Sequence, residues 1–135
     1  MTKFDEDLRE IIDANWDETV IDKPKIVLAR EVRMIDLQAG NFVIFEPASR
    51  EDEFFGIGAV DFLVRTRCSL TIKAGGSAED AEKMLNVVQK ILRNKFNWGS
   101  WQNVRVAWIE SLMNREKKIY SYSLEVEAIK FEAVE

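Results

Sequence analysis

The chain has 135 residues, the size of one domain, and its 47% hydrophobic and 32% charged residues exclude bulk disorder. A single cysteine, Cys68, excludes an intrachain disulfide, and the absence of histidine removes the commonest general base and zinc ligand. No apolar run approaches the ~20 residues of a membrane-spanning helix. We therefore expect one soluble domain over residues 1–135, made in a cytoplasm and not associated with a membrane.

The net charge of −5 is distributed unevenly along the chain. Residues 1–64 contain 7 basic and 15 acidic side chains, whereas residues 65–135 contain 12 basic and 9 acidic ones. This asymmetry favours head-to-tail association between copies, because opposite potentials attract; chance distribution over a solvated surface is the alternative. The acidic total disfavours sequence-independent DNA binding, which needs many cationic contacts with phosphates.

The first 46 residues predict a short helix followed by two short strands. Over residues 4–14 the apolar residues recur at spacings of three and four, and acids occupy the first turn, where they complement the helix dipole. Pro24 ends the irregular stretch that follows. The short strands are expected at residues 26–29 and 41–46.

Residues 49–58 are predicted to form a loop. Glu51 and Asp52 belong to a run of three acids that is followed by Phe54 and Phe55. The loop is either an arm that becomes ordered against a neighbouring copy or a connection whose two phenylalanines fold back on the core. The acidic run lacks the glycine and the spacing of a calcium loop, so we expect no metal there.

The middle of the chain predicts a long strand and a long helix. Residues 61–73 alternate strictly between apolar and polar side chains, with Cys68 on the apolar face, where a thiol acts as a small hydrophobe. Ser77 is a good N-cap for a helix over residues 78–96, whose apolar stripe runs to Phe96.

The C-terminal part predicts an antiparallel hairpin over residues 103–132. Its first strand covers residues 103–110, with Val104, Val106 and Trp108 on one face, and a turn around Asn114 covers residues 112–117. The second strand alternates over residues 118–132. The expected fold is α+β, a mostly antiparallel sheet with two helices packed on one face.

The face of the sheet opposite the helices is expected to mix large apolar side chains with charges of both signs. Such a face favours an interface, and a second copy is the simplest partner; a half-exposed face with stray apolar residues is the alternative. Its members, together with the loop residues named above, are the candidate interface residues: Leu63, Arg65, Arg67, Arg105, Ile109, Glu125, Glu127, Ile129 and Phe131.

No pattern in the sequence indicates a catalytic, cofactor or metal site. The glycines before the 78–96 helix resemble a phosphate loop only superficially, because Glu79 and Asp80 would repel a phosphate. Trp98 and Trp101, just after that helix, are expected to cap the end of the core, with ligand stacking as the alternative. We therefore expect a protein that is not an enzyme.

Several segments resemble the tail terminator, or tail-completion, proteins of long-tailed bacterial and archaeal viruses and prophages. The opening helix ends in Asn-Trp-Asp at residues 15–17 and is followed by Lys-Pro-Lys-Ile at residues 23–26. An arginine-bearing strand at residues 64–72 then leads into a helix at residues 78–95, in which residues 91–93 are Ile-Leu-Arg. Both features are similar to that family, in loose patterns over most of the chain.

The resemblance implies a structural protein of the virion neck or tail, present in the host cytoplasm during assembly. Members of that family form a ring, commonly hexameric, that ends the tail tube and joins it to the head connector. They are not enzymes, bind no cofactor, and let DNA pass through the ring without gripping it. By this resemblance Arg65 and Arg67 lie between ring neighbours, and residues 51–58 form an arm ordered only in the assembly. A cytoplasmic domain that binds a small ligand or a regulatory protein partner is the alternative.

Overall fold

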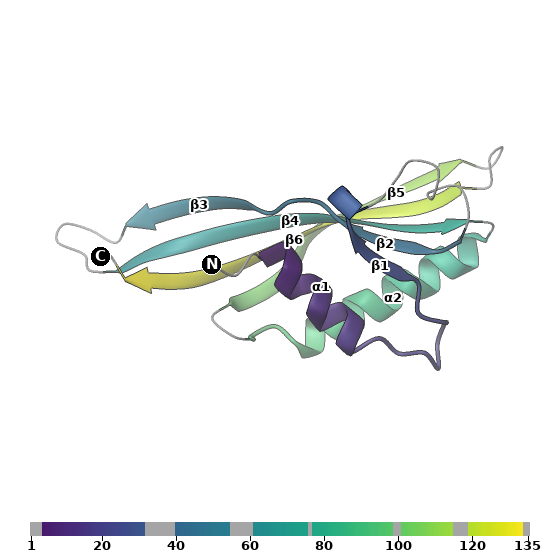
Figure 1. Ribbon diagram of the computed structural model, residues 1–135, viewed down its shortest axis with the longest axis horizontal. Coiled ribbons are helices and arrows are strands. Elements are labelled where there is room, and N and C mark those ends of the chain that lie inside the picture. The colour runs from purple at the N-terminus through teal and green to yellow at the C-terminus, as the bar shows by residue number, and fades with distance from the viewer. Residues whose placement is uncertain are drawn as a thin grey trace.

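A computed structural model describes residues 4–31, 40–54, 61–75, 77–98, 101–114 and 119–133. Two helices, a single 3-10 turn and six strands follow one another in this part of the chain (Figure 1). In order they are α1 (Phe4–Ala14), β1 (Lys25–Leu28), the 3-10 turn (Ala29–Glu31), β2 (Phe42–Phe45), β3 (Ser49–Phe54), β4 (Asp61–Gly75), α2 (Ala78–Asn94), β5 (Gln102–Asn114) and β6 (Ile119–Ala133).

The six strands described form one mixed sheet in the order β1-β2-β4-β6-β5. β1 and β2 are parallel, and every other pairing is antiparallel. β2 pairs with the C-terminal part of β4 and β3 with its N-terminal part, while β6 pairs along the whole of β4. β2 and β3 therefore follow each other along one edge of β4. This is the α+β fold that the sequence predicts.

Both helices pack on one face of the sheet, and β3, β4 and β6 extend past them as a long projection (Figure 1). The core lies between the helices and this face of the sheet. Its fully buried side chains include Leu8 and Ile12 from α1, Val88 from α2, and Leu70 and Leu124 from the sheet. Neither described helix combines the length and apolar character that crossing a membrane requires.

α1 has the predicted range, and β4 confirms the predicted alternation. Val64, Cys68 and Leu70 are fully buried toward the helices, whereas Arg65 and Arg67 are exposed on the other face. The Cys68 thiol donates a hydrogen bond to the carbonyl of Glu46, 3.3 Å away. Its burial, with the charge of Asp5 as a second cause, raises its pKa to about 12. Cys68 is therefore a structural core residue.

The prediction of a loop is wrong for residues 49–54, which form β3. Polar side chains on both faces hide this strand from an analysis of periodicity. In the β3–β4 register Glu51 stands opposite Arg65, so β4 places a basic residue opposite one acid of this strand. Within the described residues β3 pairs with β4 alone, and charged side chains are usual on such edge strands.

α2 begins as predicted and ends two residues early. The Ser77 hydroxyl accepts a hydrogen bond from the amide of Asp80, at 3.4 Å, in extended N-cap geometry. Lys95 already departs from helical geometry. Phe96, predicted as the last core position of the helix, is consequently 53% exposed. Its carbonyl instead accepts a hydrogen bond from the amide of Val104, which fixes the start of β5.

β5 differs from the prediction because a bulge reverses its faces. The register with β6 shifts between Val106 and Trp108, so Trp108 lies opposite Glu125 on the outer face and Ile109 opposite Leu124 on the helix side. The assignments of Trp108 to the inner face and Ile109 to the outer face are both wrong. The strand also continues to Asn114, through residues predicted to turn.

A close backbone contact at the start of β2 requires two glycines. Gly40 has a φ of +87°, which favours glycine because it lacks a Cβ. A Cβ on Gly75, at the end of β4, would lie 3.0 Å from the carbonyl oxygen of Gly40. The two glycines thus let the ends of β2 and β4 approach each other.

Candidate assembly surface

The outer face of the sheet, opposite the helices, carries a linked set of ion pairs. The Arg67 guanidinium lies 3.5 Å from a carboxylate oxygen of Glu125 and 3.0 Å from one of Glu127. The other oxygen of Glu127 accepts a hydrogen bond from Arg105, at 3.3 Å. Trp108 extends the set by donating its indole N–H to Glu125. Three strands, β4, β6 and β5, therefore contribute to one continuous polar network.

These ion pairs contribute little to the stability of an isolated chain. The side chains of Arg67 and Arg105 are 54% and 65% exposed, and exposed pairs contribute about 0–1 kcal/mol each. The two glutamates are more enclosed, at 19% and 23%. Removal of water from this face would strengthen the attraction within each pair and would also remove hydration from the charges.

Apolar side chains accompany the network. Trp108 and Leu112 are 43% and 51% exposed, and both lie on this face by their pairing with β6. Ile129 lies on the same face farther along β6, opposite Gln102, and is half-buried. Leu63, predicted as an exposed apolar member, is only 7% exposed and is therefore already covered within the chain.

The structure brings together some of the sequence-predicted interface residues. Arg65, Arg67, Glu125, Glu127 and Ile129 share the outer face, on adjacent strands. In the backbone register of β3, β4 and β6, the remaining positions that can be placed lie on the projection: Glu51, Asp52, Phe54 and Phe131. The side chains of Asp52, Phe54 and Phe131, and all of Phe55, lie outside the described residues.

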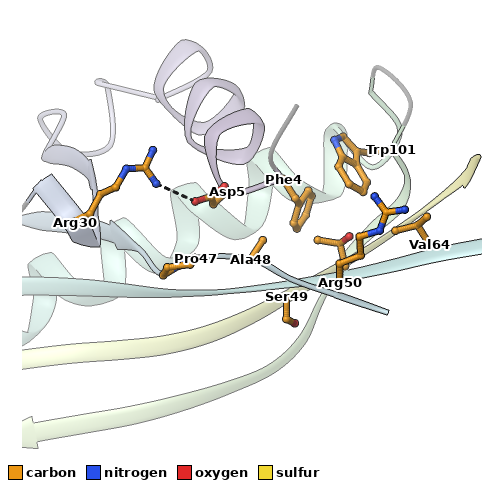
Figure 2. A pocket seen from close by; sticks show the side chains of 10 residues that line it. Phe4, Asp5, Arg30, Pro47, Ala48, Ser49, Arg50, Val64 and Trp101 are labelled. Atoms are coloured by element: carbon orange, nitrogen blue, oxygen red, sulfur yellow. Dashed lines mark ion pairs between the residues drawn. The ribbon is translucent and has the colours of Figure 1, made fainter. Parts of the chain in front are cut away.

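A second feature is a pocket of about 240 Å³ between the start of α1 and the β3–β4 pair. Figure 2 shows Arg30 and Arg50 at its two ends, with Asp5 and Phe4 between them. Asp5 is 2% exposed, and its Oδ2 lies 3.8 Å from the Arg30 guanidinium, while its buried Oδ1 has no hydrogen-bond partner. The pocket thus combines apolar walls with one buried carboxylate.

Trp98 and Trp101 cap the end of the core, as predicted. Phe4 stacks on Trp98 at a ring-centroid distance of 5.8 Å and packs at a tilt against Trp101, at 4.9 Å. The Trp101 indole N–H donates to Asp7 Oδ2 at 2.9 Å, and the Lys130 ammonium lies 4.5 Å from the centre of its ring. This cluster fastens α1 to the sheet.

Sequence reasoning missed a groove of about 660 Å³ between α2 and the edge strand β5. Three large apolar side chains line it and are exposed: Phe96 at 53%, Trp108 at 43% and Ile109 at 40%. Arg93 and Arg105 also line it. Residues 83–109 contain five basic side chains and no acidic one, but only two of the five line this groove, so the sequence carries no specific signal for it.

The described residues contain no group of three or more histidine, cysteine, aspartate or glutamate side chains placed to hold a metal ion. The acidic run in β3 is extended along a strand, so neighbouring side chains point to opposite faces of the sheet. Such an arrangement does not converge carboxylates on one point.

Comparison with known proteins gives a likeness of fold. No protein-family model matches the chain, and no curated protein matches its sequence. Among solved structures, a chain described as "Virion of native gene transfer agent (GTA) particle" has a similar fold, with a TM-score of 0.64 and 15% sequence identity. The match covers 96% of this chain and 96% of that chain. The two proteins share a fold over nearly their whole length.

Proposed function

We propose that this protein is a structural component of a phage-like virion, in which copies form a ring at the end of the tail tube. The observation that carries the proposal is the fold shared over 96% of both chains with a chain of a gene transfer agent virion. A match of that extent covers the whole fold of both chains, and not only a supersecondary motif that many proteins share. The resemblance of residues 64–72 and 78–95 to tail terminators supports the finer assignment.

The outer face of the sheet can provide the contacts that hold neighbouring copies together. It offers the Arg67–Glu127–Arg105 network beside exposed Trp108 and Leu112, which is the mixture of anchors and paired charges found in protein interfaces. In the proposed ring a neighbouring copy covers this face. The tail tube protein and the head connector are the further partners, and DNA passes through without specific contacts.

The proposal is tested by the mass and shape of the purified chain. Light scattering after size-exclusion chromatography should show a multimer, and negative-stain electron microscopy should show rings, with or without the tube protein from the same particle. The variant Glu127→Arg, which reverses the charge between two arginines, should remain folded and lose assembly. Glu79→Arg, at a 75% exposed side chain on α2, is the matched control. A wild-type chain that stays monomeric at high concentration with the tube protein present would overturn the proposal.

A second candidate function, a domain that binds a small ligand, is favoured by the pocket beside Trp101. The buried Asp5 Oδ1 would accept a hydrogen bond from a ligand donor there. The volume of about 240 Å³ argues against this function, because ligand pockets usually occupy about 300–1,000 Å³. Quenching of tryptophan fluorescence by a panel of small neutral metabolites with hydrogen-bond donors would support it, and an Asp5→Leu variant should abolish that response.

A further inference from the structure

We infer that the groove between α2 and β5 receives the turn between α1 and β1 of a neighbouring copy, so that subunits join head to tail. The inference rests on the proposed function and names the surfaces that its ring uses. The groove, hereafter the basic groove, is lined by Arg93, Phe96, Arg105, Trp108 and Ile109. The turn, hereafter the acidic turn, consists of residues 17–22.

The two surfaces have opposite charge. The acidic turn, residues 17–22, contains three acidic side chains and no basic one, whereas the residues that line the basic groove include two arginines and no acid. Glu18 and Asp22 are exposed in the acidic turn, and Arg93 and Arg105 line the basic groove. Opposite potentials of this kind steer docking and fix its orientation.

Both surfaces also expose apolar side chains, whose burial in a contact would be favourable. Val20 is 43% exposed at the acidic turn, between Asp17 and Asp22. The basic groove exposes Phe96 and Ile109, at 53% and 40%. A small branched side chain with flanking acids therefore faces an aromatic-lined cavity with flanking arginines, which is the pattern of an anchor and its pocket.

The acidic turn is held in one shape before any partner binds. Asp17 Oδ1 accepts a hydrogen bond from the Thr19 amide at 3.0 Å, and the Val20 amide donates to the Asp17 carbonyl at 3.2 Å. The Trp16 indole donates to the Ile21 carbonyl at 3.1 Å and, being 8% exposed, ties the turn to the core. The bonds from Thr19 also lower the pKa of Asp17, which keeps it ionised. A preformed loop loses little conformational entropy on docking.

The turn cannot reach the groove of its own chain, because α2 separates them. The acidic turn borders the side of α2 that carries Val87, Lys90 and Ile91, whereas the basic groove borders the side that carries Leu92 and Arg93. Each copy thus presents two different surfaces on opposite sides of one helix. Repeating such a heterologous contact gives a ring when the rotation closes.

The basic groove is continuous with the outer face of the sheet. Trp108 belongs to both, since it pairs with Glu125 on the outer face and also lines the groove. Arg105 likewise binds Glu127 and lines the groove. A neighbouring copy that covers the outer face can therefore wrap over the β5 edge and place its acidic turn in the groove.

Disulfide trapping tests the contact directly. Val20→Cys and Phe96→Cys are prepared as separate variants and mixed under mild oxidation; native Cys68 does not interfere because it is fully buried. The mixture should give a cross-linked dimer, each variant alone should give none, and the double variant should give a ladder that ends at the ring. Val20→Cys mixed with Glu79→Cys is the control and should not cross-link.

Charge reversal gives an independent measurement. Arg93→Glu and Glu18→Lys should each weaken self-association about tenfold, and the double variant should recover most of it. Lys83→Glu, on α2 outside the groove, is the matched control. If the wild type assembles but positions 20 and 96 do not cross-link, or position 20 links to itself, the inference is wrong and the proposed function stands. A wild type that never assembles would overturn both.

Discussion

The two faces of β6 use the same strand for different purposes. Toward the helices, Leu124, Val126 and Ala128 are almost completely buried. Toward the outside, Glu125 and Glu127 are partly enclosed by arginines and remain accessible. Burial on the inner face holds the chain together, whereas the outer face adds little to the folding of one copy. Substitutions on the two faces should therefore separate stability from assembly.

The largest effect is expected for an inner-face truncation. Leu124→Ala removes a fully buried side chain and leaves a cavity, which should lower the free energy of unfolding by about 2–5 kcal/mol. Leu112→Ala, on the outer face and 51% exposed, should change it by less than about 0.5 kcal/mol. Urea unfolding followed by circular dichroism measures both. Equal losses would show that the outer face is also part of the core.

Burial of Cys68 on the inner face should make the free energy of unfolding decrease at alkaline pH. Its folded pKa is about 12, above the ordinary value of 9.0, so the unfolded chain loses the thiol proton first. The stabilising contribution is complete below pH 9 and is lost as pH rises toward 12, by about 1.4 kcal/mol per unit. The stability difference between wild type and Cys68→Ala should therefore shrink above pH 9. A difference that stays constant from pH 8 to pH 10.5 would contradict this.

The two indole hydrogen bonds give a matched pair across the sheet. Trp101→Phe removes the bond to Asp7 from a side chain that is 4% exposed, and should cost about 1–2 kcal/mol. Trp108→Phe removes the bond to Glu125 from a 43% exposed side chain, and should cost less than about 0.5 kcal/mol. Thermal unfolding of both variants measures the contrast. Similar costs would mean that the outer face is more enclosed than its exposure indicates.

The smallest effect on folding is expected at the centre of the outer network. Glu127→Gln keeps the shape of the side chain and removes the charge between Arg67 and Arg105, at a cost of about 0–1 kcal/mol to one copy. Its effect on self-association should be larger, because the proposed ring would remove water from the network. Sedimentation velocity measures the effect on self-association, and chemical denaturation measures the effect on folding. A decrease of more than about 2 kcal/mol in the free energy of unfolding would contradict the view that the outer face contributes little to folding.

Elements with strong periodicity could be predicted from the sequence because a single physical requirement dominates them. β4 alternates because one face is buried along its length, and α2 begins just after Ser77 because the serine hydroxyl accepts a hydrogen bond from a free amide. β3 could not be predicted, because it forms by pairing with β4, a different segment of the chain, and carries no apolar alternation of its own. Long-range pairing of this kind is not visible in a local window.

The candidate surfaces were only partly predictable for a related reason. Arg67, Glu125 and Glu127 follow directly from alternation, so their gathering on one face could be foreseen. The bulge after Val106 could not, because nothing in residues 103–110 distinguishes an extra residue from continued alternation. That single insertion moves Trp108 to the outer face and Ile109 to the groove. The basic groove is therefore a product of register, which only the structure fixes.

The pairing of β4 with β6 has a mechanical consequence. The two strands stay in register without interruption from Asp61 opposite Ala133 to Gly75 opposite Ile119. A load pulling along these strands must shear the whole ladder at once, whereas a load across them would unzip it one bond at a time. The projection should consequently act as a stiff lever, and a twist applied at its tip would be transmitted to the part of the sheet that packs against the helices.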